Sequence, residues 1–298
     1  MMNHKSVLVK GLMVATTAIA LIGCEDENNS YNDVASEQKS TISFTPANLE
    51  PLGDDFDYEG WLITSNGPIA TGKFDIDAND KDATQTFEVL KADADDATKF
   101  VLTIEPANEE GDDIKKPTDI HILGGDIVQN TSILSTSHAT ALGTDFSQAT
   151  ARYILATPTN KNATPTQGIW YIDKSSSIPK AGLNLPELPD GWVYEGWIVD
   201  NGPISTGTFT KSDEADSNGA GPAKGMQDAP AFPGEDYVNP AKDLVGKIAV
   251  ISVEPNPDNS EAPFSIKPLV GTITNEQGMM MLDNKAADSL PSATISIK

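Results

Sequence analysis

Apolar residues occur along the chain in short runs, in which they alternate with polar residues. Residues 101–106 (Val-Leu-Thr-Ile-Glu-Pro) and 250–255 (Val-Ile-Ser-Val-Glu-Pro) are two such runs, and each ends at a proline. A period of two is typical of a β-strand, and proline interrupts strand pairing. No window shows a sustained 3.6-residue period with helix caps, whereas Thr, Ile and Val fill the strand-like runs. The sequence therefore predicts a mostly β protein.

One long pattern occurs twice. Residues 48–61 match residues 184–197 without a gap, and both contain the core Tyr-Glu-Gly-Trp. Downstream, residues 66–74 match residues 201–209, with one residue fewer between Trp and Asn in the second copy. Self-similarity of this kind predicts an internal duplication in which each copy builds the same unit.

The matched segments predict a β-hairpin in each copy. Asn-Gly followed by Pro is a strong hairpin signal between alternating apolar segments. We expect a three-residue turn at 65–67 in the first copy, with Gly67 left-handed, and a two-residue turn (Asn201, Gly202) in the second. Both turns predict the same cross-strand pairs: Tyr58 with Phe74, Gly60 with Gly72, Trp61 with Thr71, Tyr194 with Phe209, Gly196 with Gly207, and Trp197 with Thr206.

Further segments extend the duplication. Residues 120–127 match 266–273, and residues 167–173 resemble 277–283 after an insertion of about 35 residues in the first copy. Within that insertion, residues 152–157 predict one more strand.

The duplication predicts two tandem β-sandwich domains, residues 41–180 and 181–298. We expect residues 185–189, which contain two prolines, to form a stiff joint between the domains. Residues 213–230 are rich in Gly, Ala and Asp and predict a loop.

Charge and composition exclude several classes of protein. The 298 residues include 44 Asp and Glu against 20 Lys and Arg, which gives a formal net charge of −24. Arg152 is the sole arginine. Because such a surface repels phosphate backbones, nucleic-acid binding is not expected. The single cysteine, Cys24, excludes a disulfide framework and a cysteine-based zinc finger.

The beginning of the chain predicts its cellular address. Residues 1–23 read as a secretion signal, because Lys5 and Lys10 precede a short apolar segment. The sequence Leu-Ile-Gly-Cys, ending at Cys24, resembles the lipobox of bacterial lipoproteins, in which the cysteine is lipidated and becomes the N-terminus. The alternative is an unlipidated cysteine within an uncleaved anchor helix.

A solvated tether follows the cysteine. Residues 24–40 are acidic and polar and show no apolar periodicity. Acidic residues directly after a lipidated cysteine resemble the surface-export signal of lipoproteins in the Bacteroidota. We therefore expect a lipid-anchored, extracytoplasmic protein at the bacterial outer membrane or cell surface.

The Tyr-Glu-Gly-Trp motif, the Asn-Gly-Pro hairpin and the strand ending in Glu-Pro together resemble the extracytoplasmic C-terminal domain of anti-sigma-K factors. Both copies carry the resemblance, over residues 48–127 and 184–273. It implies a small β-sandwich outside the cytoplasm. In those factors a cytoplasmic sigma-binding region and a transmembrane helix precede the domain. The sequence has no counterpart of either, so direct binding of a sigma factor is not expected.

The repeated motif supplies candidates for a binding groove, namely Tyr58, Trp61, Gly72, Tyr194, Trp197 and Gly207. Trp61 and Trp197 could stack on sugar rings. Alternatively they pack the inside of each sandwich, which is the commoner role of a Trp beside Thr in a hairpin. The facing glycines predict a close neighbour, usually an aromatic ring.

Catalytic residues are scarce. After removal of the signal, the chain retains His121 and His138, and no Gly-x-Ser-x-Gly motif is present. We expect His121 to point outward from a strand and His138 to lie in a solvated loop.

Acidic segments raise the question of calcium binding. Glu214, Asp216 and Asn218 before Gly219 imitate the start of a calcium loop, but Gly225 stands where a bidentate acid is needed. The other acidic groups are Asp75, Asp77, Asn79 and Asp80; Asp93, Asp95 and Asp96; and Glu109, Glu110, Asp112 and Asp113. The first group has an acid at the glycine position of the loop, and in the others solvated charge is expected.

These observations predict a non-enzymatic, lipid-anchored protein of the cell envelope. Its two anti-sigma-factor-like modules would bind or sense a protein or surface partner. The alternative is a calcium- or glycan-binding surface adhesin, and a hydrolase is the third candidate. No cofactor and no metal are expected, and the lipid on Cys24 would supply the contact with the membrane.

Overall fold

Antiparallel β-strands form almost all of the regular structure. The computed structural model describes residues 38–298 except 110, 112–114, 218–228, 258–259 and 277–278. Cys24, the predicted signal and most of the tether lie outside the described residues, as does most of the predicted loop at 213–230. The described α-helices are the short α1 (Lys91–Asp96) and α2 (Ala286–Ser289). The prediction of an all-β fold is confirmed.

The first sheet folds over on itself around an aromatic core. Its strands, in order across the sheet, are β3 (Gly67–Phe74), β2 (Phe56–Thr64), β5 (Lys99–Pro106), β6 (His121–Asp126), β7 (Thr131–Ser135), β19 (Ser292–Ile297), β1 (Lys39–Ala47) and β4 (Gln85–Leu90). The rings of Phe44 on β1 and Phe100 on β5 are 6.1 Å apart, so the two halves of the sheet face each other. The edge strands also meet, since the rings of Phe74 and Phe87 are 5.6 Å apart.

The second sheet repeats this arrangement. Its strands, in order, are β14 (Pro203–Phe209), β13 (Trp192–Val199), β16 (Ile248–Pro255), β17 (Leu269–Thr272), β18 (Met280–Asn284), β8 (Thr150–Leu155), β9 (Gly168–Trp170) and β15 (Gly234–Asp236), and β12 (Leu183–Asn184) also pairs with β8. A separate ribbon contains β10 (Ile172–Asp173) and β11 (Lys180–Ala181). Because β2, β3, β5 and β6 occupy the places of β13, β14, β16 and β17, the two copies fold alike.

The predicted hairpins are present, but the predicted register is correct only at the end of each hairpin that is far from the turn. Tyr58 pairs with Phe74 and Gly60 with Gly72, as predicted. Beyond this point Trp61 pairs with Ala70 rather than with Thr71, because Thr71 is the extra residue of a β-bulge.

The second hairpin has the same bulge. Tyr194 pairs with Phe209 and Gly196 with Gly207, as predicted, but Trp197 pairs with Ser205, which leaves Thr206 as the extra residue. Each bulge shifts the register by one residue and thereby changes the turn. The first copy has a two-residue turn between Thr64 and Gly67, and the second has three residues between Val199 and Pro203, the reverse of the prediction.

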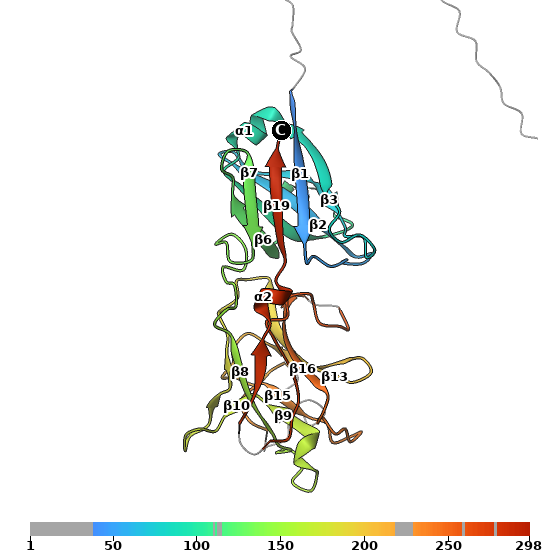
Figure 1. Ribbon diagram of the computed structural model, residues 1–298, viewed down its shortest axis with the longest axis vertical. Coiled ribbons are helices and arrows are strands. Elements are labelled where there is room, and N and C mark those ends of the chain that lie inside the picture. Colours follow the sequence, from blue (N-terminus) through green and yellow to red (C-terminus); the bar gives the residue numbers. More distant parts are fainter. Residues whose placement is uncertain (1–37, 110, 112–114, 218–228, 258–259, 277–278) are drawn as a thin grey trace, which may run out of the picture. The chain divides into compact units, whose positions relative to one another are not determined.

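The strands that close the two sheets are exchanged between the copies. β8 follows β7 along the chain, yet it pairs with β18 in the second sheet. β19 follows β18, yet it lies between β7 and β1 in the first sheet (Figure 1). The two strands occupy equivalent places, beside β18 and β7. Each sheet is therefore completed by a strand from the other copy.

The exchanged strands share one pattern of side chains. Ala151 and Tyr153 of β8 are buried, as are Ala293 and Ile295 of β19, and the residues between them are exposed or half-buried. In both strands a small residue precedes a large one on the face toward the core. The alternation predicts that each strand has a buried face, but it does not select the sheet.

This exchange divides the chain differently from the predicted boundary between residues 180 and 181. β8 and β9 precede that boundary but lie in the second sheet, and β19 lies in the first. The chain passes from one sheet to the other at 136–149 and again at 285–291. Residues 185–189 are not a joint between the sheets, because they connect β12 to β13 within the second sheet.

The insertion in the first copy also has a different role from the predicted one. Its predicted strand at 152–157 exists as β8, although in the second sheet. Residues 167–173 and 277–283 are not equivalent, since β9 and β18 lie on either side of β8 in one sheet.

Removing the C-terminal strand should therefore damage the first sheet. In a chain that ends at Leu290, β1 and β7 lose their shared neighbour, and the buried Ala293, Ile295 and Ile297 are lost from the core. We expect amide hydrogen exchange, measured by mass spectrometry, to show loss of protection in β1 and β7 and retention in β13 and β16. Unchanged protection of β1 and β7 would contradict the placement of β19 between these two strands.

Candidate functional site

The tryptophans of the repeated motif are buried and do not line a groove. Trp61 has no exposed surface, and Trp197 is 2% exposed. Neither ring is free to stack on a sugar in this conformation, and both have the packing role that the hairpin context favours.

In the first copy, the Trp61 indole begins a buried chain of hydrogen bonds. Its Nε1 donates to Thr103 Oγ1 at 2.9 Å, and the Thr103 hydroxyl donates to the Glu105 carboxylate. Glu105 Oε1 also accepts a hydrogen bond from the backbone N–H of Thr118 at 2.9 Å. The chain thus links the motif on β2 to the segment that leads into β6.

The second copy repeats the chain at equivalent positions. Trp197 Nε1 donates to Ser252 Oγ at 2.8 Å, and the Ser252 hydroxyl donates to Glu254. Glu254 accepts hydrogen bonds from the backbone N–H of Phe264, 2.9 Å from Oε1 and 3.1 Å from Oε2. Because a buried carboxylate needs such donors, this network sets the position of the segment around Phe264.

The alternating pattern does not single out these carboxylates, because Glu105 and Glu254 each stand directly before a strand-ending proline. A signal was present. In both copies a hydroxyl residue stands two positions before the Glu, on the same side of an otherwise apolar strand. Two polar residues at positions i and i+2 on the buried face of an apolar strand indicate a hydrogen-bonded pair.

The motif tyrosines anchor the segment before each hairpin. Tyr58 Oη donates to the backbone oxygen of Glu50 at 2.8 Å, and Tyr194 Oη donates to that of Pro186 at 2.6 Å. Burial raises the pKa of both hydroxyls well above the usual value, so both remain donors.

The motif glycines accommodate the bulge. A Cβ on Gly60 would lie 2.4 Å from Phe100 Cζ, so the predicted aromatic neighbour is present. A Cβ on Gly196 would instead lie 2.2 Å from the hydroxyl of the bulged Thr206. Gly72 and Gly207, which follow the bulges, have φ of +123° and +111°, a conformation that favours glycine.

Three carboxylates gather beside the network of the first copy. Glu105 is fully buried, Glu59 is 5% exposed, and Glu109 Oε2 lies 2.9 Å from Lys73 Nζ. Burial raises the pKa of Glu105, and the charge of Glu109 raises it further. Burial, followed by the charge of Glu105, raises the pKa of Glu59 to about 7. Glu59 therefore holds its proton up to near neutral pH.

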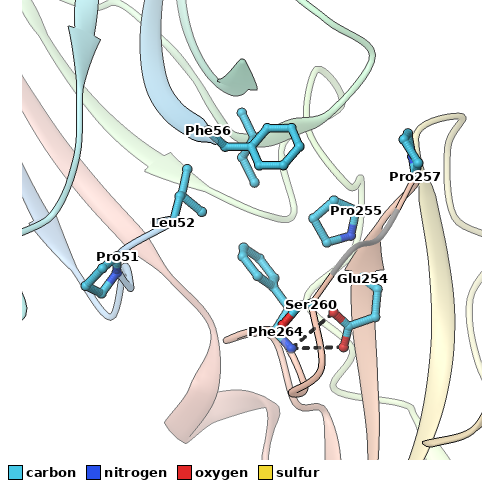
Figure 2. A pocket seen from close by; sticks show the side chains of 9 residues that line it. Pro51, Leu52, Phe56, Glu254, Pro255, Pro257, Ser260 and Phe264 are labelled. Carbon is cyan, nitrogen blue, oxygen red and sulfur yellow. Dashed lines mark hydrogen bonds between the residues drawn. The ribbon is translucent and has the colours of Figure 1, made fainter. Parts of the chain in front are cut away.

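An apolar cavity of about 110 Å³ lies beside the network of the second copy. Its lining residues come from both sheets and are Pro51, Leu52, Phe56, Ile104, Glu254, Pro255, Pro257, Ser260 and Phe264. Figure 2 shows Leu52, Phe56 and Phe264 around one space, with Glu254 bonded to the Phe264 backbone. A cavity of 150 Å³ holds a benzene molecule, so this one holds about one small apolar side chain.

The two histidines meet at one loop residue, Thr140. His121 Nδ1 is 2.8 Å from the backbone oxygen of Thr140, and His138 Nδ1 is 2.8 Å from its hydroxyl. His138 Nε2 also lies 3.5 Å from Asp126 Oδ1. Both rings are half-buried, in contrast to the expected solvation of His138. These contacts hold the loop at 136–149 against β6.

The predicted acidic groups do not converge. Glu214 pairs with Lys211 at the surface, whereas Asp216 is buried and accepts a hydrogen bond from the backbone N–H of Gly234. Asp95 pairs with Lys91, and Asp77 bonds to the following Asn79. Asn218, Gly219, Gly225, Glu110, Asp112 and Asp113 lie outside the described residues. Within the described ranges, no group of three or more Asp, Glu, His or Cys side chains is arranged to hold a metal ion.

The fold and these sites define an all-β protein with two duplicated, interlocked sheets. Comparison of the chain with protein-family models, curated proteins and solved structures found no match. No helix of the described part is long and apolar enough to cross a membrane.

The protonation of Glu59 predicts a pH-dependent stability. The folded state holds this proton more tightly than the unfolded chain. The stabilisation that protonated Glu59 gives is therefore complete below pH 4.5, the pKa of Glu in the unfolded chain, and is lost as the pH rises to about 7. Glu59→Gln should therefore raise the free energy of unfolding at pH 8 by about 2 kcal/mol and leave it nearly unchanged at pH 4.5. Urea denaturation across this range measures the difference.

The matched control is Glu261→Gln, since Glu261 is an exposed acid. The difference in the free energy of unfolding between Glu261→Gln and the wild type should not vary with pH. Parallel pH curves for Glu59→Gln and the wild type would refute the assignment of a retained proton to Glu59.

Proposed function

We propose that the chain is a non-enzymatic, lipid-anchored protein of the bacterial cell envelope, and that it binds a protein partner. The lipobox-like sequence at Cys24 supports the anchor, and the acidic tether supports display at the outer membrane or cell surface. The likeness of both modules to the extracytoplasmic domain of anti-sigma-K factors supports a role outside the cytoplasm. Direct binding of a sigma factor is not part of the proposal.

The apolar cavity carries the proposal of partner binding. Leu52, Phe56 and Phe264 belong to different segments, and the Glu254 network holds Phe264 in place. A pre-formed apolar pocket with a few polar groups at its edge suits one anchoring side chain of a partner. Its volume is too small for a sugar chain or a lipid, so we propose that an aliphatic or aromatic side chain of a protein enters it.

The rest of the structure is compatible with binding rather than catalysis. Glu105 and Glu254, two deeply buried carboxylates, bind backbone N–H groups and hydroxyls of their own chain. His121 and His138 tie down a loop. Such groups support a scaffold, and the exposed segments are left for recognition.

The anchor is tested by Cys24→Ala. Without a thiol, no lipid can be attached, so the variant should move from the membrane fraction to the soluble fraction of fractionated cells. Ser30→Ala, a substitution within the tether, is the control and should remain in the membrane fraction. Retention of Cys24→Ala in the membrane would contradict the anchor.

The cavity is tested by photo-crosslinking in cells. A benzoyl-phenylalanine at Pro51, an exposed residue of the cavity lining, should form a covalent adduct with the partner. The same label at Glu187, the exposed equivalent of Pro51 in the second copy, should not. Adding Leu52→Asp, which places a charge in the cavity, should abolish the adduct at 51. Adducts that persist with Leu52→Asp, or equal adducts at both positions, argue against the cavity.

A further inference from the structure

We propose that residues 292–297 form an exchangeable strand, and that β19 of one chain can complete the first sheet of a second copy. The proposal concerns self-association and does not depend on the partner proposed above. It follows from three features: the slot that β19 fills, the segment that leads into it, and the exchange already present within the chain.

The slot lies between β7 and β1 and is paired on both sides. Ile295 of β19 lies opposite Phe44 on one side and Ser132 on the other. In the described residues, β7 is joined to β6 by the single pair Gly124 with Ser135. Without β19, β1 and β7 would each have one unpaired edge, and such an edge is a template for another strand.

Backbone pairing holds β19 along its whole length. Pairing extends to the last residue, since the backbone groups of Thr41 and Lys298 exchange two hydrogen bonds, of 2.8 and 2.9 Å. A strand held by such pairing can enter a sheet of its own chain or of a second chain through the same contacts.

The segment before β19 directs the strand away from its neighbour in sequence. Residues 285–291 follow β18, and Leu290 is extended (φ −69°, ψ 133°) before Pro291. Proline favours this extended conformation in the residue before it, so the segment does not turn back beside β18. The connection between β18 and β19 thus consists of the short helix α2 and the extended step from Leu290 to Pro291.

The two copies already make the exchange within one chain. β8 completes the second sheet and β19 the first, in equivalent places. An exchange between chains would make the same contacts, so only the entropy of association opposes it, and concentration decides the outcome. We therefore expect monomers in dilute solution and exchanged dimers after refolding at high concentration.

Disulfide capture tests this directly. Ile133 of β7 lies opposite Thr294 of β19, and both are exposed. The hydrogen bond from Ile297 N to Asn130 O makes this a non-hydrogen-bonded pair, in which the side chains are closest. In mature chains carrying Cys24→Ser, Ile133→Cys is placed in one chain and Thr294→Cys in another, which is isotopically labelled. The two chains are unfolded, mixed and refolded in oxidising buffer at several concentrations.

The proposal expects a disulfide between the two chains, identified by mass, whose yield rises with concentration. Mixing Ile133→Cys with Ser176→Cys, an exposed position between β10 and β11, should give no such rise. A chain with both Ile133→Cys and Thr294→Cys should form the disulfide internally and remain monomeric. The proposal is overturned if the double variant closes internally while the mixed chains form no disulfide above the Ser176→Cys control at any concentration. Failure of the double variant to close would overturn the pairing on which it rests.

Discussion

A sheet that lacks an interior strand exposes two rows of unpaired backbone groups, and here each sheet obtains that strand from the other copy of the duplication. β19 inserts between β7 and β1, so Ile42 pairs with Ile297 across nearly the whole length of the described chain. Such pairing closes late, because the cost of bringing distant segments together precedes the gain from their contacts. The first sheet cannot be complete until residues 292–297 have paired with β1 and β7. Two segments then connect the sheets, which restrains their separation more than a single joint would.

Inside each sheet, a buried polar chain runs from a tryptophan through a hydroxyl to a glutamate. Burial of such a chain in an apolar interior requires that its groups are paired, since an unpaired carboxylate there would be strongly destabilising. The backbone N–H groups of Thr118 and Phe264 supply the pairing. The carboxylate thereby fixes a loop outside the sheet by means of residues inside it. This connection explains why Tyr-Glu-Gly-Trp and the Glu-Pro strand occur together in both copies.

The two copies share this scaffold but surround it differently. In the first, Glu59, Glu109 and Lys73 gather at the network, and burial raises the pKa of Glu59. In the second, the loop held by Glu254 forms one wall of the apolar cavity. A duplicated frame with divergent loops suits recognition, because loops can change while the frame keeps them in position. The cavity and the lipobox-like sequence support the proposal of a displayed binding protein, and the histidines contact a loop of their own chain.

The sequence alone determined the class of secondary structure, the duplication and the pairing of Tyr58 with Phe74, because alternation and turn residues are local properties. It also favoured burial of Trp61 and Trp197. It could not reveal the bulges at Thr71 and Thr206, since one extra residue can be placed in the turn or in the strand with the same apolar pattern.

Only the tertiary structure decided which sheet each closing strand enters. β8 and β19 have the same inward pattern and fit equivalent slots, so no local signal separates a tandem arrangement from an exchanged one. The buried carboxylates and the cavity were likewise decided there, because they depend on segments distant in sequence meeting in space. Local pattern records which face of a strand is buried, whereas pairing depends on the partners that the whole chain brings together.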